Sequence, residues 1–161
     1  MTTLVTKSPD DTKELAAQIA PLLRPGDFVL LAGDLGAGKT AFTQGLGRAL
    51  GITEPITSPT FTLVRVYDGQ VRLVHVDVYR LDYIQEITDL AITELVDDQA
   101  IAVVEWGDVA EAVLPPDYLE LQIAYAAGDE ERRILMHAVG WSWSARQTAL
   151  ERAVDRWRVD G

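Results

Sequence analysis

The sequence has no cysteine, which excludes disulfide bonds and thiolate metal sites. It has no apolar run long enough to span a membrane and no basic leader, so we expect a cytoplasmic protein without membrane contact. Basic residues are few: 14 lysines and arginines stand against 25 aspartates and glutamates, a formal net charge of −11. Broad nucleic-acid binding needs a basic surface and is therefore disfavoured. The acidity is typical of a soluble protein and also suits docking on a basic protein surface.

A complete phosphate-binding P-loop lies in the first third of the chain. It fits the pattern G-x-x-x-x-G-K-[ST] without a gap. The apolar segment 28–32 before it predicts a buried strand, and segment 41–50 after it predicts a helix, which is the context that the motif requires. We therefore predict that nucleotide phosphates bind the eight residues of the motif: Gly33, Asp34, Leu35, Gly36, Ala37, Gly38, Lys39 and Thr40.

The physical chemistry of the loop explains its composition. Glycines let backbone N–H groups point inward at phosphate oxygens, and the following helix directs its positive end to the same place. Lys39 supplies a point charge for the β- and γ-phosphates, and Thr40 offers a hydroxyl to Mg²⁺. The sequence thus predicts a site for a nucleoside triphosphate with Mg²⁺, in which Lys39 is also a catalytic candidate.

An acid follows a second buried strand, predicted over residues 100–104. Glu105 would then lie at the carboxyl edge of the sheet beside the P-loop, where a Walker B acid supports Mg²⁺. Thr40 and Glu105 are therefore the predicted metal ligands. Trp106 comes next, and the sequence leaves open whether it lies near the nucleotide or serves packing.

Two further polar segments carry catalytic candidates. His75, Asp77 and Tyr79 share one face of a predicted strand. Either the Asp77 carboxylate orients the attacking water or binds Mg²⁺ through water, or this face is the solvated side of a hairpin. Thr60 lies in segment 58–62, where nucleotide switches sense the γ-phosphate through a hydroxyl and a backbone N–H. That segment also fits an ordinary turn.

The order of the predicted elements gives the fold class. It predicts an α/β P-loop NTPase, three-layered, with a mixed sheet and an inserted antiparallel hairpin. We interpret residues 1–140 as one P-loop ATPase domain and residues 141–161 as a C-terminal helical extension of the same domain. Ser8 is expected to cap the first helix, and Ser144 to open a capping box in the tail. The remaining elements are helices over 9–23, 85–96, 109–114 and 144–159, and strands over 61–67, 71–79, 118–125 and 132–138.

Four motifs, in their order and spacing, resemble the TsaE (YjeE) family, the P-loop ATPases of bacterial threonylcarbamoyladenosine tRNA modification. The resemblance covers about residues 5–140. Gly107 stands where the family often has proline, which loosens the prediction of the local turn. The motifs are Asp34-Leu35-Gly36-Ala37-Gly38-Lys39-Thr40, Ser58-Pro59-Thr60-Phe61, His75-Val76-Asp77-Val78-Tyr79-Arg80-Leu81 and Glu105-Trp106-Gly107.

The resemblance implies ATP and Mg²⁺ as cofactors, held by the P-loop and by the two metal ligands predicted above. Asp77 is implicated in hydrolysis and in coupling to partners, and Thr60 belongs to a segment similar to the family's first switch. Arg133, or else Arg132, would approach the nucleotide, as would Trp106.

The implied function is that of an ATPase subunit required for threonylcarbamoylation of adenosine 37 in tRNAs that read codons beginning with A. It would act with the TsaD and TsaB proteins and contact tRNA mainly through that complex. Hydrolysis is expected to be slow without partners, because no arginine finger is obvious. A small-molecule kinase of the P-loop class is the alternative, disfavoured because residues 114–128 hold no arginine for a lid. A GTPase is disfavoured because the string Asn-Lys-x-Asp is absent.

Overall fold

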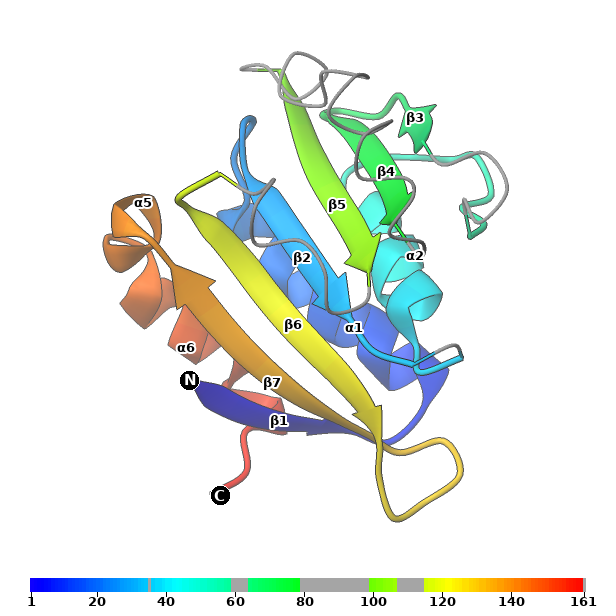
Figure 1. Cartoon of the computed structure of the whole chain (residues 1–161), viewed down its shortest axis with the longest axis vertical. Helices are drawn as coiled ribbons and strands as arrows, with labels where there is room; N and C mark the ends of the chain where they lie inside the picture. The colour runs from blue at the N-terminus through cyan, green and yellow to red at the C-terminus, as the bar shows by residue number, and fades with distance from the viewer. Residues whose placement is uncertain (35, 59–63, 79–98, 107–114, 161) are drawn as a thin grey trace.

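The computed structural model describes residues 1–34, 36–58, 64–78, 99–106 and 115–160 (Figure 1). The helices predicted over residues 85–96 and 109–114 lie outside these ranges, as do the candidate residues Leu35 and Thr60. These interpretations therefore stay predictions. In the described ranges, no helix is both long enough and apolar enough to cross a membrane.

A mixed seven-stranded sheet forms the centre of the molecule, in the order β1-β7-β6-β2-β5-β4-β3. Strands β6, β2, β5 and β4 run parallel, while β7 pairs antiparallel with β6 and with β1, and β3 pairs antiparallel with β4. This confirms the predicted mixed sheet and the hairpin inserted after the P-loop helix. The strands are β1 Thr2–Thr6, β2 Phe28–Ala32, β3 Val64–Tyr67, β4 Arg72–Val78, β5 Ala100–Trp106, β6 Tyr118–Tyr125 and β7 Arg132–Val139.

The described helices gather on one face of this sheet (Figure 1). They are α1 (Pro9–Ile19), α2 (Lys39–Ala49), α5 (Trp141–Ser144) and α6 (Gln147–Val154), with the 3-10 helices η1 (Ala20–Leu22) and η3 (Asp155–Trp157). Their apolar residues and every second residue of the central strands form one buried core. The core includes Leu15, Ile19, Phe42, Leu46, Val29, Leu31, Leu73, Ile101, Val103, Leu119, Leu121 and Ile134.

The first helix begins where the sequence predicts. The Ser8 hydroxyl accepts the backbone N–H of Asp11 at 3.0 Å, which satisfies a donor left free in the first turn. Strand β1, which pairs with β7 along its whole length, is an element that the sequence analysis missed. Its five residues are too few for periodicity alone to identify them as a strand.

The tail is not the single helix predicted over residues 144–159. It consists of α5, α6 and η3, and α6 has Arg146 at its N-cap with no side-chain cap bond, so the capping box of Ser144 and Gln147 is wrong. Tertiary contacts overrode the local pattern. Trp143 is buried, and the Arg146 side chain turns to Asp27 instead of the helix end.

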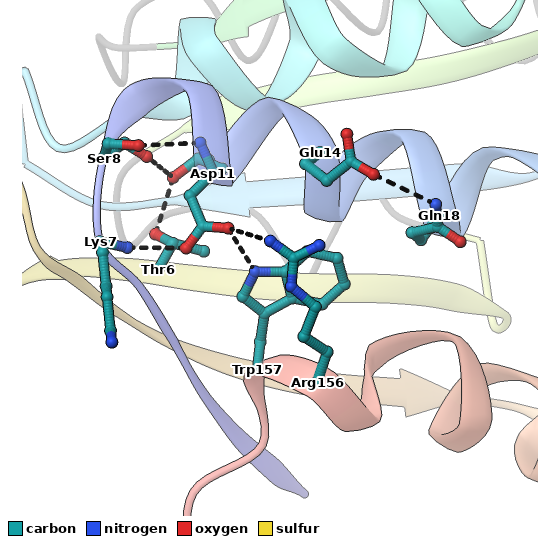
Figure 2. A network of polar contacts seen from close by, with 9 residues as sticks. Thr6, Lys7, Ser8, Asp11, Glu14, Gln18, Arg156 and Trp157 are labelled. Atoms are coloured by element: carbon teal, nitrogen blue, oxygen red, sulfur yellow. Dashed lines mark hydrogen bonds and ion pairs between the residues drawn. The ribbon is translucent and has the colours of Figure 1, made fainter.

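The end of the tail closes on the start of the first helix (Figure 2). The Asp11 carboxylate accepts the Trp157 indole Nε1–H at 2.8 Å and the Lys7 backbone N–H at 2.9 Å. Beyond it, the Val159 N–H donates to the Thr3 carbonyl at 3.0 Å. The two ends of the chain are thus held together beside β1.

Candidate nucleotide-binding site

The P-loop joins the carboxyl end of β2 to the first turn of α2. Its glycines take backbone angles that side chains rarely adopt: φ is 152° at Gly33, 78° at Gly36 and 115° at Gly38, the N-cap of the helix. Glycine is the residue that reaches this region without strain. The helix begins at Lys39, so its free N–H groups and positive end open onto the loop.

The side chain of Lys39 extends back over the P-loop toward Gly33, the first residue of the motif. Its ammonium group donates to the Gly33 carbonyl at 2.5 Å, and its side chain is half-buried. Within the same helix, the Thr43 hydroxyl donates to the Lys39 carbonyl at 3.0 Å. The Lys39 ammonium group is therefore held close to the loop amides that are predicted to bind phosphate.

Glu105 lies beside this loop at the carboxyl end of β5. In the parallel β2–β5 pair it is in register with Leu31, and in the β4–β5 pair with Asp77. Both carboxylates are nearly buried, with exposed fractions of 3% for Glu105 and 7% for Asp77. The Glu105 carboxylate lies 2.8 Å from the His75 ring nitrogen Nε2, an ion-pair geometry if that ring is protonated.

The donor set suits Mg²⁺. Thr40 occupies the first turn of α2 and Glu105 the adjacent strand end, and hydroxyl and carboxylate oxygens are the ligands that this ion prefers. Among the described residues, no group of three or more histidine, aspartate or glutamate side chains could enclose a metal. A protein that supplies one or two oxygen ligands, with phosphates and water completing the shell, fits Mg²⁺ better than an all-protein metal centre.

The β6–β7 hairpin also reaches the P-loop, through Arg132. Its guanidinium Nε donates to the Ala37 carbonyl at 2.9 Å, and its Cζ lies 4.6 Å from the centre of the Tyr125 ring. Arg133 is exposed, and its strand partners are Ala124 and Val5. Because neighbouring strand residues point to opposite faces, only one of the two arginines can take this position; the sequence favoured Arg133, and the structure has Arg132 there. A nucleotide contact by Arg133 stays a prediction.

The remaining candidates have simple placements. Asp34 is an exposed residue of the loop, and Ala37 is fully buried within it. Trp106 ends β5, where its backbone is in register with Ala32 and Val78. Its contact with nucleotide stays a prediction.

Replacing Gly33 by alanine is expected to destabilise the loop more than the same change at Gly26. At both positions φ is positive, but a Cβ at Gly33 would collide with the Ile123 carbonyl of β6, whereas one at Gly26 would meet nothing within 4 Å. We expect Gly26→Ala to lower the free energy of unfolding by about 1 kcal/mol. Gly33→Ala should lower it by about 1–3 kcal/mol more, because the strand must move.

Urea unfolding of both variants, with nucleotide affinity measured in parallel, checks this. Equal destabilisation by the two variants would mean that the loop absorbs a side chain at Gly33 without contact with β6.

Comparisons with known proteins find relatives that match most of the chain. The family model "Threonylcarbamoyl adenosine biosynthesis protein TsaE" matches residues 6–134. The tRNA threonylcarbamoyladenosine biosynthesis protein TsaE of Bacillus subtilis is 45% identical over 136 residues, 84% of each chain. The protein of the same name from Streptomyces coelicolor is 42% identical over 146 residues, 86% of this chain and 97% of its own.

A solved structure gives the same result. The crystal structure of Bacillus subtilis YdiB matches with a TM-score of 0.78 and 38% identity, covering 93% of both chains. This similarity and the sheet order are consistent with the predicted P-loop NTPase fold. The P-loop, the strand-end glutamate and both kinds of match lead to one conclusion: the chain belongs to the TsaE family of threonylcarbamoyladenosine biosynthesis proteins.

Proposed function

We propose that this chain is a Mg²⁺-dependent ATPase subunit required for threonylcarbamoylation of adenosine 37 in tRNAs that read codons beginning with A. It would act in the cytoplasm with TsaD and TsaB. One observation carries the proposal: the Lys39 ammonium group lies over a P-loop beside which β5 carries the buried carboxylate Glu105 near its carboxyl end. That pairing of a cation and an acid is what Mg²⁺–ATP binding needs.

The protein's part in hydrolysis is mostly positioning. Loop amides and Lys39 hold the β- and γ-phosphates, and the Thr40 hydroxyl and the Glu105 carboxylate would hold Mg²⁺. When bound, the ion neutralises charge that develops on the phosphates. Asp77, one strand beyond Glu105, is the group that we assign to the attacking water, and Thr60 the group that we assign to sensing the γ-phosphate.

Partners would complete the site. Arg132 already donates to Ala37 and to the carbonyls of Asp129 and Glu131, so it supports the loop and is poorly placed to act as an arginine finger. We therefore expect slow hydrolysis by the chain alone. The net charge of −11 favours docking on a basic protein surface, with tRNA contacted mainly through the assembly.

Reconstitution tests the proposal directly. Unmodified tRNA, TsaD, TsaB, ATP and a threonylcarbamoyl donor are combined with and without this chain, and modified adenosine is counted over several turnovers. We expect sustained modification only with the chain and with ATP hydrolysis. An equal yield without the chain would overturn the proposal, and ATP-dependent phosphorylation of a metabolite would favour a small-molecule kinase.

A further inference from the structure

A fully buried histidine lies against the proposed metal ligand. His75, on β4, has an exposed fraction of 0%, and its Nε2 is 2.8 Å from Glu105 Oε1. In the parallel β4–β5 pair, His75 is in register with Val103, two residues before Glu105. His75 therefore reaches diagonally along one face of the sheet, a distance that a long side chain spans.

The sequence around His75 makes a polar residue at this position costly. On the face of the sheet that carries His75, Leu73 of the same strand and Val103, its register partner on β5, are fully buried residues of the core. Burying an imidazole and a carboxylate among such groups costs free energy that a well-packed apolar pair would not. A specific task for the pair is therefore the better explanation.

The ring's second nitrogen indicates what the task is. In the described part of the chain, Nδ1 of His75 is buried and has no hydrogen-bond partner. A histidine kept for stability alone is expected to satisfy both nitrogens. The ring instead directs its one bond at Glu105. Because an ionised carboxylate only accepts hydrogen bonds, Nε2 carries the hydrogen in this pair and Nδ1 is left as the unpaired acceptor.

We infer that His75 is a positioning residue, whose Nε2–H holds the Glu105 carboxylate in the orientation that binds Mg²⁺ in the nucleotide complex. The inference rests on the proposed function. A hydrogen bond to one carboxylate oxygen restricts rotation of the Glu105 side chain, so less entropy is lost when the ion binds. Residues that orient metal ligands in this way typically contribute 10- to 100-fold in metal affinity, as an order of magnitude.

Two substitutions separate orientation from simple burial. In His75→Gln, the amide nitrogen extends about as far from the backbone as Nε2, so a donor can still reach Glu105. In His75→Asn, the amide nitrogen corresponds to Nδ1 and falls short. Both variants keep a buried polar amide of neutral charge, so they differ mainly in reach.

The measurement is the affinity of a fluorescent ADP analogue, first in EDTA and then over a Mg²⁺ titration. We expect nucleotide affinity in EDTA to be unchanged in both variants. The Mg²⁺ midpoint should rise about 10- to 100-fold in His75→Asn and stay within about threefold of the unchanged protein in His75→Gln. Thermal unfolding in EDTA monitors any general loss of stability.

The outcomes that would contradict a positioning role for His75 are distinct from those that would contradict the proposed function. Unchanged Mg²⁺ midpoints in both variants, or equal shifts in both, would overturn the positioning role. If His75→Asn does not fold, His75→Gln alone remains decisive, because a tenfold rise in its midpoint contradicts the inference. Absence of Mg²⁺-dependent nucleotide binding in the unchanged protein would instead refute the proposed function, and this inference with it.

Discussion

Replacing Lys39 by alanine is expected to weaken nucleotide binding by about thirty-fold to a few thousand-fold. The ammonium group is half-buried over the P-loop and donates to the Gly33 carbonyl, at the point where the β- and γ-phosphates would arrive. Truncating one partner of a desolvated, hydrogen-bonded charge pair costs about 2–5 kcal/mol, and about 1.4 kcal/mol corresponds to a tenfold change in affinity. Arg132, which also contacts the loop, is held by backbone carbonyls and does not replace the lysine.

The measurement is equilibrium titration with ATP and with ADP. Lys13→Ala is the matched control: it removes the same charge from α1, and Lys13 lies with Gln44 and Arg48 around a separate surface hollow of about 370 Å³. We expect the affinity of Lys13→Ala to stay within about twofold of the unchanged protein, because Lys13 lies beside the later turns of α2, away from the P-loop, where salt screens its charge. An affinity of Lys39→Ala within threefold of the unchanged protein would refute the P-loop assignment.

The P-loop region could be predicted from sequence because its determinants are local. A buried strand, glycines at positive φ and a helix start follow one another within a short stretch, and each has its own residue pattern. The β6–β7 hairpin could be predicted in the same way, because apolar and polar residues alternate along its two strands and a turn at Gly128 joins them.

The remaining features depend on contacts between distant segments. The bond between His75 and Glu105 spans 30 residues and exists only because β4 and β5 pair in one particular register. Whether Arg132 or Arg133 contacts the P-loop likewise depends on which face of β7 lies against the loop that precedes α2. Sequence periodicity identifies most of the strands but does not give the register between them.

Replacing Arg146 by alanine is expected to lower the free energy of unfolding by about 3–5 kcal/mol, the usual cost of removing one partner from a buried ion pair. Arg146 donates to both carboxylate oxygens of Asp27, at 2.6 and 3.0 Å, with side-chain exposures of 5% and 11%. It also donates to the Leu22 carbonyl at 3.0 Å, and its Cζ lies 3.8 Å from the centre of the Trp143 ring, over which it stacks. One side chain thus joins the tail to the segment that leads into β2.

The exposed Arg152, in the last turn of α6, provides the control. Arg152→Ala removes the same charge, and we expect it to change stability by less than about 0.5 kcal/mol. Urea unfolding followed by circular dichroism and by tryptophan fluorescence gives both values. A loss below about 1 kcal/mol in Arg146→Ala would mean that the pair adds little beyond its own desolvation cost.

The same experiment tests whether residues 141–161 belong to the main domain. Leu150, Val154 and Trp157 of the tail lie in the same buried core as α1, so a loosened tail should expose core surface and destabilise the whole. Arg146→Ala should then still unfold in one transition, with coincident curves from both probes. An early fluorescence transition, separate from loss of the sheet signal, would instead make the tail an independent unit.

The double variant Asp27→Ala with Arg146→Ala tests whether the ion pair is the main link between the tail and the rest of the domain. If it is, the double variant should be little less stable than Arg146→Ala alone.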